Sequence, residues 1–243
     1  MPERRAQAPA LTVSLLISTV ADGSLGLSAS ADAASAIRAR VAFWQRSSLI
    51  PQSIYVAGAV HGSAVAVVPN RAASLAADGT RLLPGVDALI TARADLSLMM
   101  VYADCLPVVL YDPVNGALGL IHAGWRGTLV GVVERALEAM RGTFGSDLSR
   151  MQARFGPSIC GRCYQVGEEV VELARRRLGV STGAAFRIGA RWHFDLAHAN
   201  REILESQGVE VIPCDSCTYE SELYFSHRRR PDGSRFALVA RLC

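Results

Sequence analysis

Short apolar runs of strand length, each bounded by residues that turn the backbone, most constrain how this chain folds. These runs are rich in Val, Ile and Leu, and clusters of Gly, Pro, Asn and Asp separate them. They occupy residues 11–19, 53–59, 64–68, 88–91, 98–102, 106–111, 116–121, 151–155, 209–212 and 235–240. Because every strand leaves backbone groups for a neighbour to satisfy, the runs predict extensive sheets.

Four further segments have the spacing of amphipathic helices. They occupy residues 31–45, 128–140, 168–178 and 196–207. In the first, Ala34, Ile37, Val41 and Trp44 form one apolar stripe; the last has Asp195 as its N-cap. Since no linker or repeat divides the chain, we expect one α/β (α+β) domain with stacked sheets over residues 1–243.

The charged residues exclude several classes of protein. All 25 of the Lys and Arg residues are arginine, which rules out Schiff-base enzymes and P-loop nucleotide binding. The net charge is only +3, and the arginine runs at 175–177 and 228–230 have no interleaved aromatics. We therefore expect no nucleic-acid partner.

Two segments could be mistaken for membrane or export signals. Residues 47–70 carry no Asp, Glu, Lys or Arg, but Pro51 and Gly58 favour a buried strand pair over a spanning helix. Arg4 and Arg5 precede an apolar stretch, as in a signal peptide. Polar residues interrupt that stretch, so we interpret it as a first strand of a cytoplasmic protein without a membrane partner, and export remains the alternative.

The six cysteines include two CxxC pairs, Cys160 with Cys163 and Cys214 with Cys217. The gap between the pairs, residues 164–213, is far longer than the roughly 15–20 residues of a zinc ribbon. A structural zinc, a redox pair and unrelated thiols near turns all stay open.

A predicted hairpin brings two chemically active side chains together. Cys105 precedes the run 106–111, and His122 follows the run 116–121. The intervening residues 112–116 have Pro and Asn-Gly, which favour a turn. Because a hairpin returns its far end to its start, we expect Cys105 and His122 to be neighbours. His61 also follows a strand-like run.

Two histidines and one cysteine suit zinc or copper. Three protein ligands leave one position open, which is typical of a catalytic metal. Cys105 and His122 could instead form a nucleophile–base pair without a metal, or be unrelated buried residues.

Candidate substrate contacts lie in three loops. Gly124 and Gly127 flank Arg126, and Thr128 is a suitable N-cap for the predicted helix, so this segment could bind phosphate or carboxylate. Packing of Trp125 and Arg126 on the sheet is the alternative. Further candidates are Tyr164 for stacking on a base or sugar, and Arg228 and Arg229 for an anion; a solvated arginine turn is the alternative.

Several motifs together resemble the YfiH family, also called laccase-domain proteins, polyphenol oxidases or peptidoglycan editing factors. They are VHG at 60–62, DALIT at 87–91, ADCLP at 103–107, HAGWRGT at 122–128, GPSI at 156–159, YQV at 164–166, FDL at 194–196, CT at 217–218 and FSHRR at 225–229. They occur in order over most of the chain.

This resemblance implies a four-layer α/β/β/α sandwich with mixed sheets and a zinc held by His61, Cys105 and His122. It also implies phosphorolysis of purine nucleosides (adenosine, inosine, methylthioadenosine) to free base and ribose 1-phosphate, with adenosine deaminase activity. The implied partners are a purine nucleoside and phosphate; the oligomeric state is not implied.

Other functions remain open beside this one. A copper-dependent polyphenol oxidase (laccase) normally needs several coppers and many more than the five histidines present. A cysteine-type hydrolase that edits peptidoglycan precursors and a non-catalytic binding protein are further alternatives.

The chain departs from the family pattern at several positions. Ala59, Gln165 and His227 replace the family's usual Gln, Glu and Tyr, and its Asn-Arg near the first helix is absent, with Arg38 or Arg40 as a stand-in. These departures concern substrate contacts and leave the metal triad intact.

Overall fold

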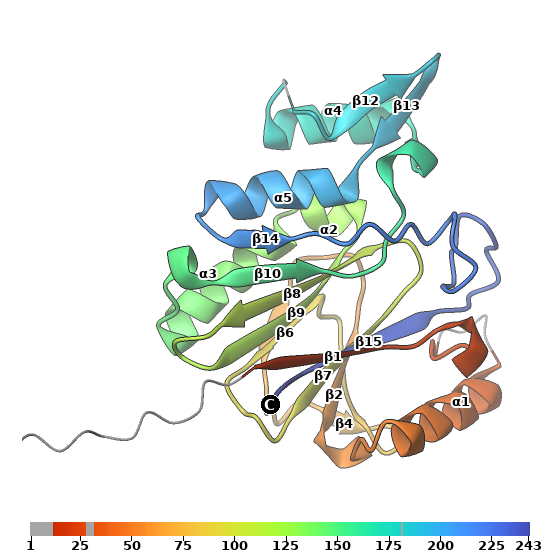
Figure 1. The fold of residues 1–243 in the computed structure, drawn as a ribbon, viewed down its shortest axis with the longest axis vertical. Helices are drawn as coiled ribbons and strands as arrows, with labels where there is room; N and C mark the ends of the chain where they lie inside the picture. The colour runs from red at the N-terminus through yellow and green to blue at the C-terminus, as the bar shows by residue number, and fades with distance from the viewer. Residues whose placement is uncertain (1–11, 28–31, 181) are drawn as a thin grey trace, which may run out of the picture.

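The structure is a computed structural model that describes residues 12–27, 32–180 and 182–243. Within these residues, two six-stranded sheets stack on one another (Figure 1). The first sheet has the order β1 (Val13–Ile17), β15 (Phe236–Leu242), β7 (Ser97–Tyr102), β2 (Ile54–Gly58), β5 (Arg81–Pro84) and β4 (Ser74–Leu75). It is mixed, because β15 is antiparallel to β1 and β7 while β2 is parallel to β7 and β5.

The second sheet is also mixed and carries the predicted hairpin. Its order is β14 (Glu210–Ile212), β10 (Gln152–Phe155), β8 (Leu106–Asp112), β9 (Ala117–Ala123), β6 (Ala88–Thr91) and β3 (Val65–Val67). The turn between β8 and β9 forms where it was predicted, since the Asp112 carboxylate accepts the backbone N–H of Val114 at 2.9 Å.

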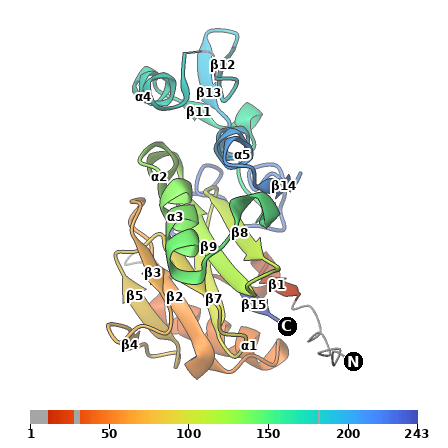
Figure 2. The ribbon, with the colours of Figure 1, turned by 90° about the vertical axis from the view of Figure 1, so that its left-hand side faces the viewer.

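Helices cover the outer face of each sheet (Figures 1 and 2). The helix α1 (Ala33–Arg46) packs Phe43 and Trp44 against Met99 of the first sheet. The helices on the second sheet are α2 (Trp125–Leu129), α3 (Val132–Phe144) and α5 (Leu196–Ser206). A separate apolar core lies between the sheets, so the predicted four-layer α/β/β/α sandwich is confirmed.

The four layers explain why the sequence shows continuous apolar runs and not alternating ones. A strand in an inner layer is covered on both faces, so both sets of its side chains are apolar. In β9 every residue is buried: Leu120 points to the core between the sheets, and Ile121 points to the helices.

A smaller sheet projects from the sandwich beside α4 (Glu168–Leu178), at the top of Figure 1. Its order is β11 (Gln165–Val166), β13 (Arg191–Phe194) and β12 (Ala185–Ile188). No continuous apolar run in the sequence marks these strands or β4 and β5, because each has at most four residues and most of their residues are not buried.

Two helix predictions are wrong in detail. The segment predicted as one helix at 128–140 is split into α2 and α3, because Gly131 adopts a left-handed conformation (φ 87°) that interrupts the helix. Thr128 therefore lies inside α2 and caps no helix. In α1, Ala34 and Val41 are exposed, and the buried stripe is Ala36, Arg40, Phe43 and Trp44.

The first strand is confirmed as β1, which pairs with β15. Arg4, Arg5, Leu11 and Ala31 lie outside the described residues. The two strands predicted within 47–70 exist as β2 and β3, but they belong to different sheets and do not pair with each other.

No helix in the described part of the chain is long and apolar enough to cross a membrane.

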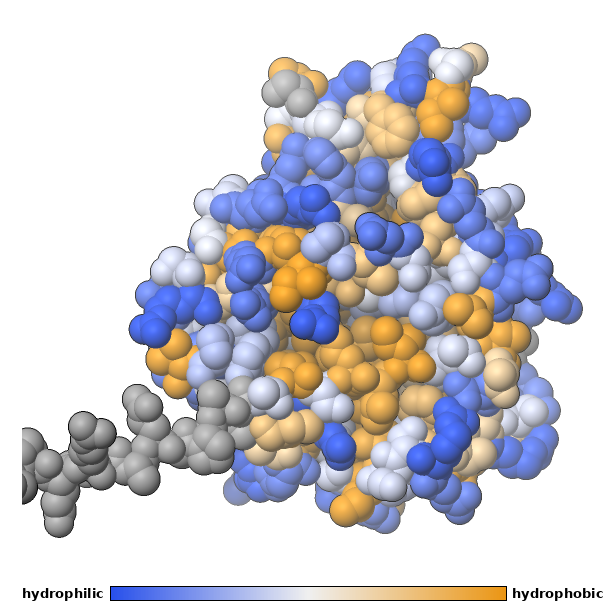
Figure 3. Space-filling model, viewed as in Figure 1, coloured by the Kyte–Doolittle hydropathy of each residue, from blue (hydrophilic) through white to orange (hydrophobic). Residues whose placement is uncertain are grey.

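Figure 3 shows hydrophobic residues gathered in the middle of one face, with hydrophilic residues around them. Near β1 and β14, a cavity of about 260 Å³ is lined partly by Val13, Leu15 and Ile212.

A buried ion pair fastens α1 to the loop before β5. The Arg40 guanidinium lies 2.7 Å from the Asp78 carboxylate, and the two side chains are 3% and 0% exposed. Arg40 Nε also donates to the carbonyl of Leu25 at 2.8 Å.

We predict that Asp78→Asn lowers the free energy of unfolding by about 3 kcal/mol, because it leaves Arg40 buried without its counter-charge. Asp95→Asn, which breaks the exposed pair with Arg93, is the matched control and should leave stability nearly unchanged. Urea denaturation measures both; equal effects would contradict the prediction.

Candidate functional site

The β8–β9 hairpin places Cys105 beside His122. Pro107 is paired opposite His122, and Leu106 is paired opposite Ala123, so Cys105 precedes β8 at the end where β9 finishes. His61 comes from the loop between β2 and β3 and completes the group, with its ring centre 4.9 Å from that of His122. The three ligand atoms all lie within 4.8 Å of one another.

One buried carboxylate, that of Asp87, holds both histidines. It accepts the backbone N–H groups of Val60, His61 and Gly62 at 3.2, 2.9 and 2.8 Å. Its Oδ1 also lies 3.1 Å from Nδ1 of His122. Burial alone raises the pKa of Asp87, but these hydrogen bonds outweigh it and lower the pKa. The carboxylate therefore stays ionised and orients both side chains.

The donor set fits a metal ion. With Nδ1 of His122 engaged by Asp87, Nε2 remains free to bind a metal, and such a carboxylate–histidine pair is the usual support for a metal ligand. Two imidazoles and a thiol suit zinc or copper and leave a coordination position for another molecule.

The same residues also form a charged pair in the absence of metal. Burial raises the pKa of Cys105, but the charge and hydrogen bond of His122, with a smaller contribution from His61, lower it to about 6. Burial lowers the pKa of His122, but Cys105 and Asp87 raise it to about 9. Between these values the pair is a thiolate and an imidazolium.

Two non-glycine residues of the site have positive φ: His61 of the triad (62°) and Asp104, which directly precedes Cys105 (86°). Asp104 accepts hydrogen bonds from the Thr218 hydroxyl at 2.7 Å and the Arg228 backbone N–H at 2.6 Å. These bonds hold the backbone before Cys105 in an unfavourable conformation, as is common at functional sites. Asp87 in the DALIT motif and Asp104 in the ADCLP motif are site residues that were not predicted, and their place in these motifs is the sequence signal that could have identified them.

The triad opens onto a cavity of about 620 Å³. Arg126, Tyr164 and Arg228 line it, as do His227 and Ala59, where the chain departs from the family pattern. Arg38 and Arg40 in α1 were the two candidates to replace the family's Asn-Arg near the first helix. Arg40 lines the cavity, whereas Arg38 is exposed beside Asp32.

Arg126 lies in the first turn of α2, whose N-cap is Gly124, so the prediction that Thr128 caps the helix after Arg126 is wrong. Thr128 is buried and accepts a hydrogen bond from Asn200 at 3.0 Å. The guanidinium of Arg126 stacks on the ring of Trp125 at 4.2 Å, and no carboxylate in the described part of the chain pairs with it. Its positive charge is thus available to a ligand.

Arg228 and Arg229 have different roles. The Arg228 guanidinium lies 4.9 Å from the centre of the Tyr164 ring, inside the cavity, and donates to the carbonyl of Gln165 at 2.7 Å. Arg229 does not line the cavity. Its guanidinium donates to backbone carbonyls of Thr218, Tyr219, Ser221 and Tyr224, so it holds its own loop together.

Comparison with known proteins agrees with the sequence motifs. The family model "Multi-copper polyphenol oxidoreductase laccase" matches residues 17–242. The chain belongs to this family. The chain is similar to the Bacillus licheniformis hypothetical protein YfiH, with a TM-score of 0.85 and 25% identity over 98% of both chains.

Two relatives of this family carry names that state an activity. "Purine nucleoside phosphorylase SCO2081" of Streptomyces coelicolor is 40% identical over 182 residues, which is 73% of this chain and 70% of that protein. "Adenosine deaminase RL5" from an unknown prokaryotic organism is 37% identical over 178 residues, which is 70% of this chain and 67% of that protein.

We predict that the Cys105 thiol of metal-free protein is alkylated with a midpoint near pH 6, because the thiolate is the reactive form. Mass spectrometry of the peptide that contains Cys105 would follow the rate against pH. His122→Ala should move the midpoint upward, since it removes the neighbouring positive charge. A wild-type rate that still rises steeply above about pH 8 would contradict the assignment.

Gly124 leaves room for the triad. A Cβ at this position would lie 2.9 Å from Sγ of Cys105 and 3.1 Å from Cδ2 of His61, while its φ of −77° is open to any residue. Gly124→Ala should therefore displace ligands without straining the backbone. We expect at least about a ten-fold increase in the zinc concentration that half-protects Cys105 from alkylation.

Gly142→Ala is the matched control, because a Cβ there meets nothing within 4 Å. It should leave zinc protection unchanged and stabilise α3 by about 0.5–1 kcal/mol. Equal zinc protection in the two variants would show that Gly124 has no such role.

Proposed function

We propose that this protein is a zinc-dependent purine nucleoside phosphorylase with adenosine deaminase activity. The observation that carries the proposal is the group of His61, Cys105 and His122 at the wall of a 620 Å³ cavity. That volume suits a nucleoside-sized ligand. The names of the Streptomyces coelicolor and RL5 relatives support both activities.

The walls of the cavity offer the contacts that these substrates need. Arg126 presents a guanidinium that no carboxylate of the described residues pairs with, and it can bind two oxygens of a phosphate. Tyr164 offers a half-buried ring for packing against the base or the sugar, and Arg228 fixes that ring from one side. Burial raises the pKa of Tyr164 to about 12, so it remains a neutral hydrogen-bond donor.

In phosphorolysis, a phosphate oxygen held by Arg126 forms a bond to the anomeric carbon of the ribose. The bond from that carbon to the purine nitrogen breaks, and the base leaves with its electron pair and takes up a proton. A zinc ion at His61, Cys105 and His122 would supply Lewis-acid polarisation and, for deamination, activation of water. Asp87 keeps both histidine ligands oriented for this role.

The proposal is tested by incubating zinc-loaded protein with adenosine and phosphate. We expect adenine and ribose 1-phosphate, together with deaminated products, and we expect inosine alone when phosphate is omitted. Cys105→Ala should lose both activities by at least about 100-fold. No product from zinc-loaded wild-type protein on adenosine, inosine or methylthioadenosine would overturn the proposal.

Arg126→Met separates the two activities. It removes the charge that binds phosphate, so kcat/KM for phosphate should fall by about ten-fold or more, as for loss of a charge-assisted hydrogen bond. Deamination measured without phosphate should change much less. Arg135→Met, on the exposed face of α3, is the control. An equal loss of both activities would argue against a phosphate contact.

A cysteine-type hydrolase, acting for example on peptidoglycan precursors, is the second candidate. The observation that favours it is the pairing of Cys105 with His122 and of His122 with Asp87, which also matches a nucleophile, base and orienting acid. Such an enzyme would keep its activity after a chelator removes the metal, whereas a zinc-dependent phosphorylase would lose it.

A copper-dependent oxidase fits the described residues less well. Of the two groups of possible metal ligands among them, only the triad contains histidine, and multi-copper oxidation needs several histidine-rich sites. Metal analysis that finds zinc and no copper would exclude it.

We also propose a cytoplasmic location, because none of the six cysteines is in a disulfide, which is typical of a reducing compartment.

A further inference from the structure

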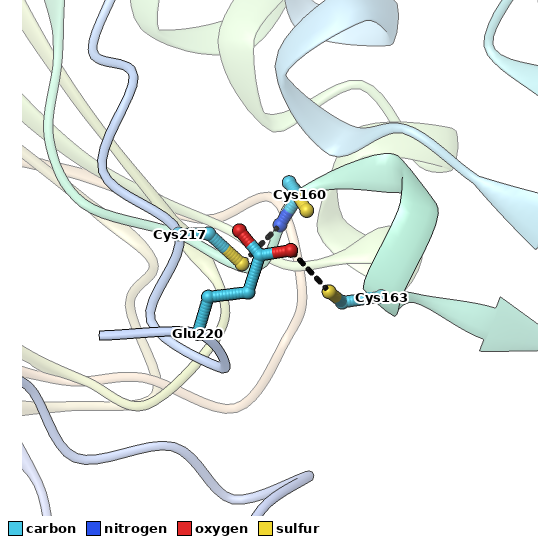
Figure 4. Close-up of side chains that lie close together, drawn as sticks. All are labelled: Cys160, Cys163, Cys217 and Glu220. Atoms are coloured by element: carbon cyan, nitrogen blue, oxygen red, sulfur yellow. Dashed lines mark hydrogen bonds between the residues drawn. The ribbon is translucent and has the colours of Figure 1, made fainter. Parts of the chain in front are cut away.

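Four ligand-type side chains gather outside the triad (Figure 4). Cys160 and Cys163 flank a short turn between β10 and β11, whereas Cys217 and Glu220 belong to the segment that follows β14. Figure 4 shows the three sulfur atoms and the carboxylate turned toward one another. Their ligand atoms all lie within 4.8 Å of one another, and none of the cysteines is in a disulfide.

The spacing of these atoms suits a tetrahedral ion. Zinc–sulfur bonds of about 2.3 Å place tetrahedral ligand atoms about 3.5–3.8 Å apart. Sγ of Cys163 lies 3.4 Å from Oε1 of Glu220, and the remaining pairs fall within the 4.8 Å limit. A small contraction around an ion would bring all four atoms to bonding distance.

We propose that Cys160, Cys163, Cys217 and Glu220 form a second metal site that binds zinc and has a structural role. Thiolates are soft ligands, so a set with three of them selects zinc over magnesium or calcium. Four protein ligands leave no open position for a substrate, which is the arrangement of a structural site and not of a catalytic one.

The backbone around the group is already organised. The backbone N–H of Cys160 donates to Sγ of Cys217 at 3.3 Å, and a parallel bridge joins Ser158 to Cys217. These contacts already hold the two segments that carry the ligands against each other.

The negative charge that these four side chains carry when ionised favours the binding of a cation. Three thiolates and a carboxylate would carry four negative charges, which repel one another at these distances. Arg162 lies beside them, with its guanidinium 3.4 Å from the Glu220 carboxylate, and offsets part of that charge. A divalent ion would neutralise most of the rest.

The two CxxC pairs contribute unequally to this site. Cys214 lies outside the group, and Glu220 takes the place that a zinc ribbon would give to a fourth cysteine. The long gap between the pairs therefore does not exclude zinc, because the fold and not the sequence spacing brings Cys163 and Cys217 together.

The proposed zinc site lies on the two segments that also carry Tyr164 and Arg228 of the cavity wall. Tyr164 directly follows Cys163, and Arg228 follows Glu220 within the same segment. These two residues meet in the cavity wall, where the guanidinium lies 4.9 Å from the centre of the ring. A zinc ion would tie together the two segments that carry them. This site does not depend on the function proposed above.

Zinc content tests the site directly. We expect Cys163→Ser to lower the zinc content of purified protein by about one ion per chain, because it removes one of four ligands. Cys214→Ser is the matched control, because Cys214 belongs to a CxxC pair but lies outside the group. This variant should lose no zinc. Cys105→Ala reports the triad separately. Unchanged zinc in Cys163→Ser would overturn the proposal.

A second measurement needs no variant and holds even if Cys163→Ser does not fold. In wild-type protein, Cys160, Cys163 and Cys217 should resist alkylation until a chelator is added, and all three should then react. Protection that is lost only on addition of a reductant would indicate a disulfide and overturn the zinc site. Immediate alkylation of the three thiols in zinc-loaded protein would overturn it as well.

Discussion

The carboxylate of Asp87 is the interaction on which the candidate active site depends. It is fully buried, accepts three consecutive backbone N–H groups from residues 60–62 and orients the ring of His122. The left-handed backbone of His61 is unfavourable on its own, and these hydrogen bonds offset its cost. Without this carboxylate, the backbone N–H groups of residues 60–62 would lose the acceptor that joins the His61 loop to the strand pair β6–β9.

The stacked sheets supply the low-dielectric surroundings that make this carboxylate effective. Asp87 directly precedes β6, which pairs with β9, and β9 pairs with β8, so three neighbouring strands deliver Asp87, His122 and Cys105 to one end of the second sheet. His122 is buried there, while His61 is exposed and faces the cavity. The site thus combines His122 from β9, Cys105 from the position directly before β8 and His61 from a loop.

Much of this arrangement could be predicted from the sequence, for identifiable reasons. The proximity of Cys105 and His122 followed from a hairpin whose turn residues were evident, and the continuous apolar runs followed from strands covered on both faces. The break between α2 and α3 could not, because the left-handed Gly131 lies inside an apolar pattern that continues with helical spacing across it. The separate role of Arg229 and the group around Cys217 depend on contacts between segments distant in the sequence, which no local pattern records.

The zinc affinity of Asp87→Asn tests most directly whether Asp87 holds the ligands of a metal ion at the triad. The amide nitrogen of Asn would face backbone N–H groups that need an acceptor, while the size of the side chain is kept. Competition with a fluorescent chelator, with a Cys105→Ala chain as reference for zinc bound elsewhere, isolates this site. If Asp87 orients both histidines, Asp87→Asn should bind zinc there about 10–100-fold more weakly than wild type. Equal affinity in a folded variant would contradict it.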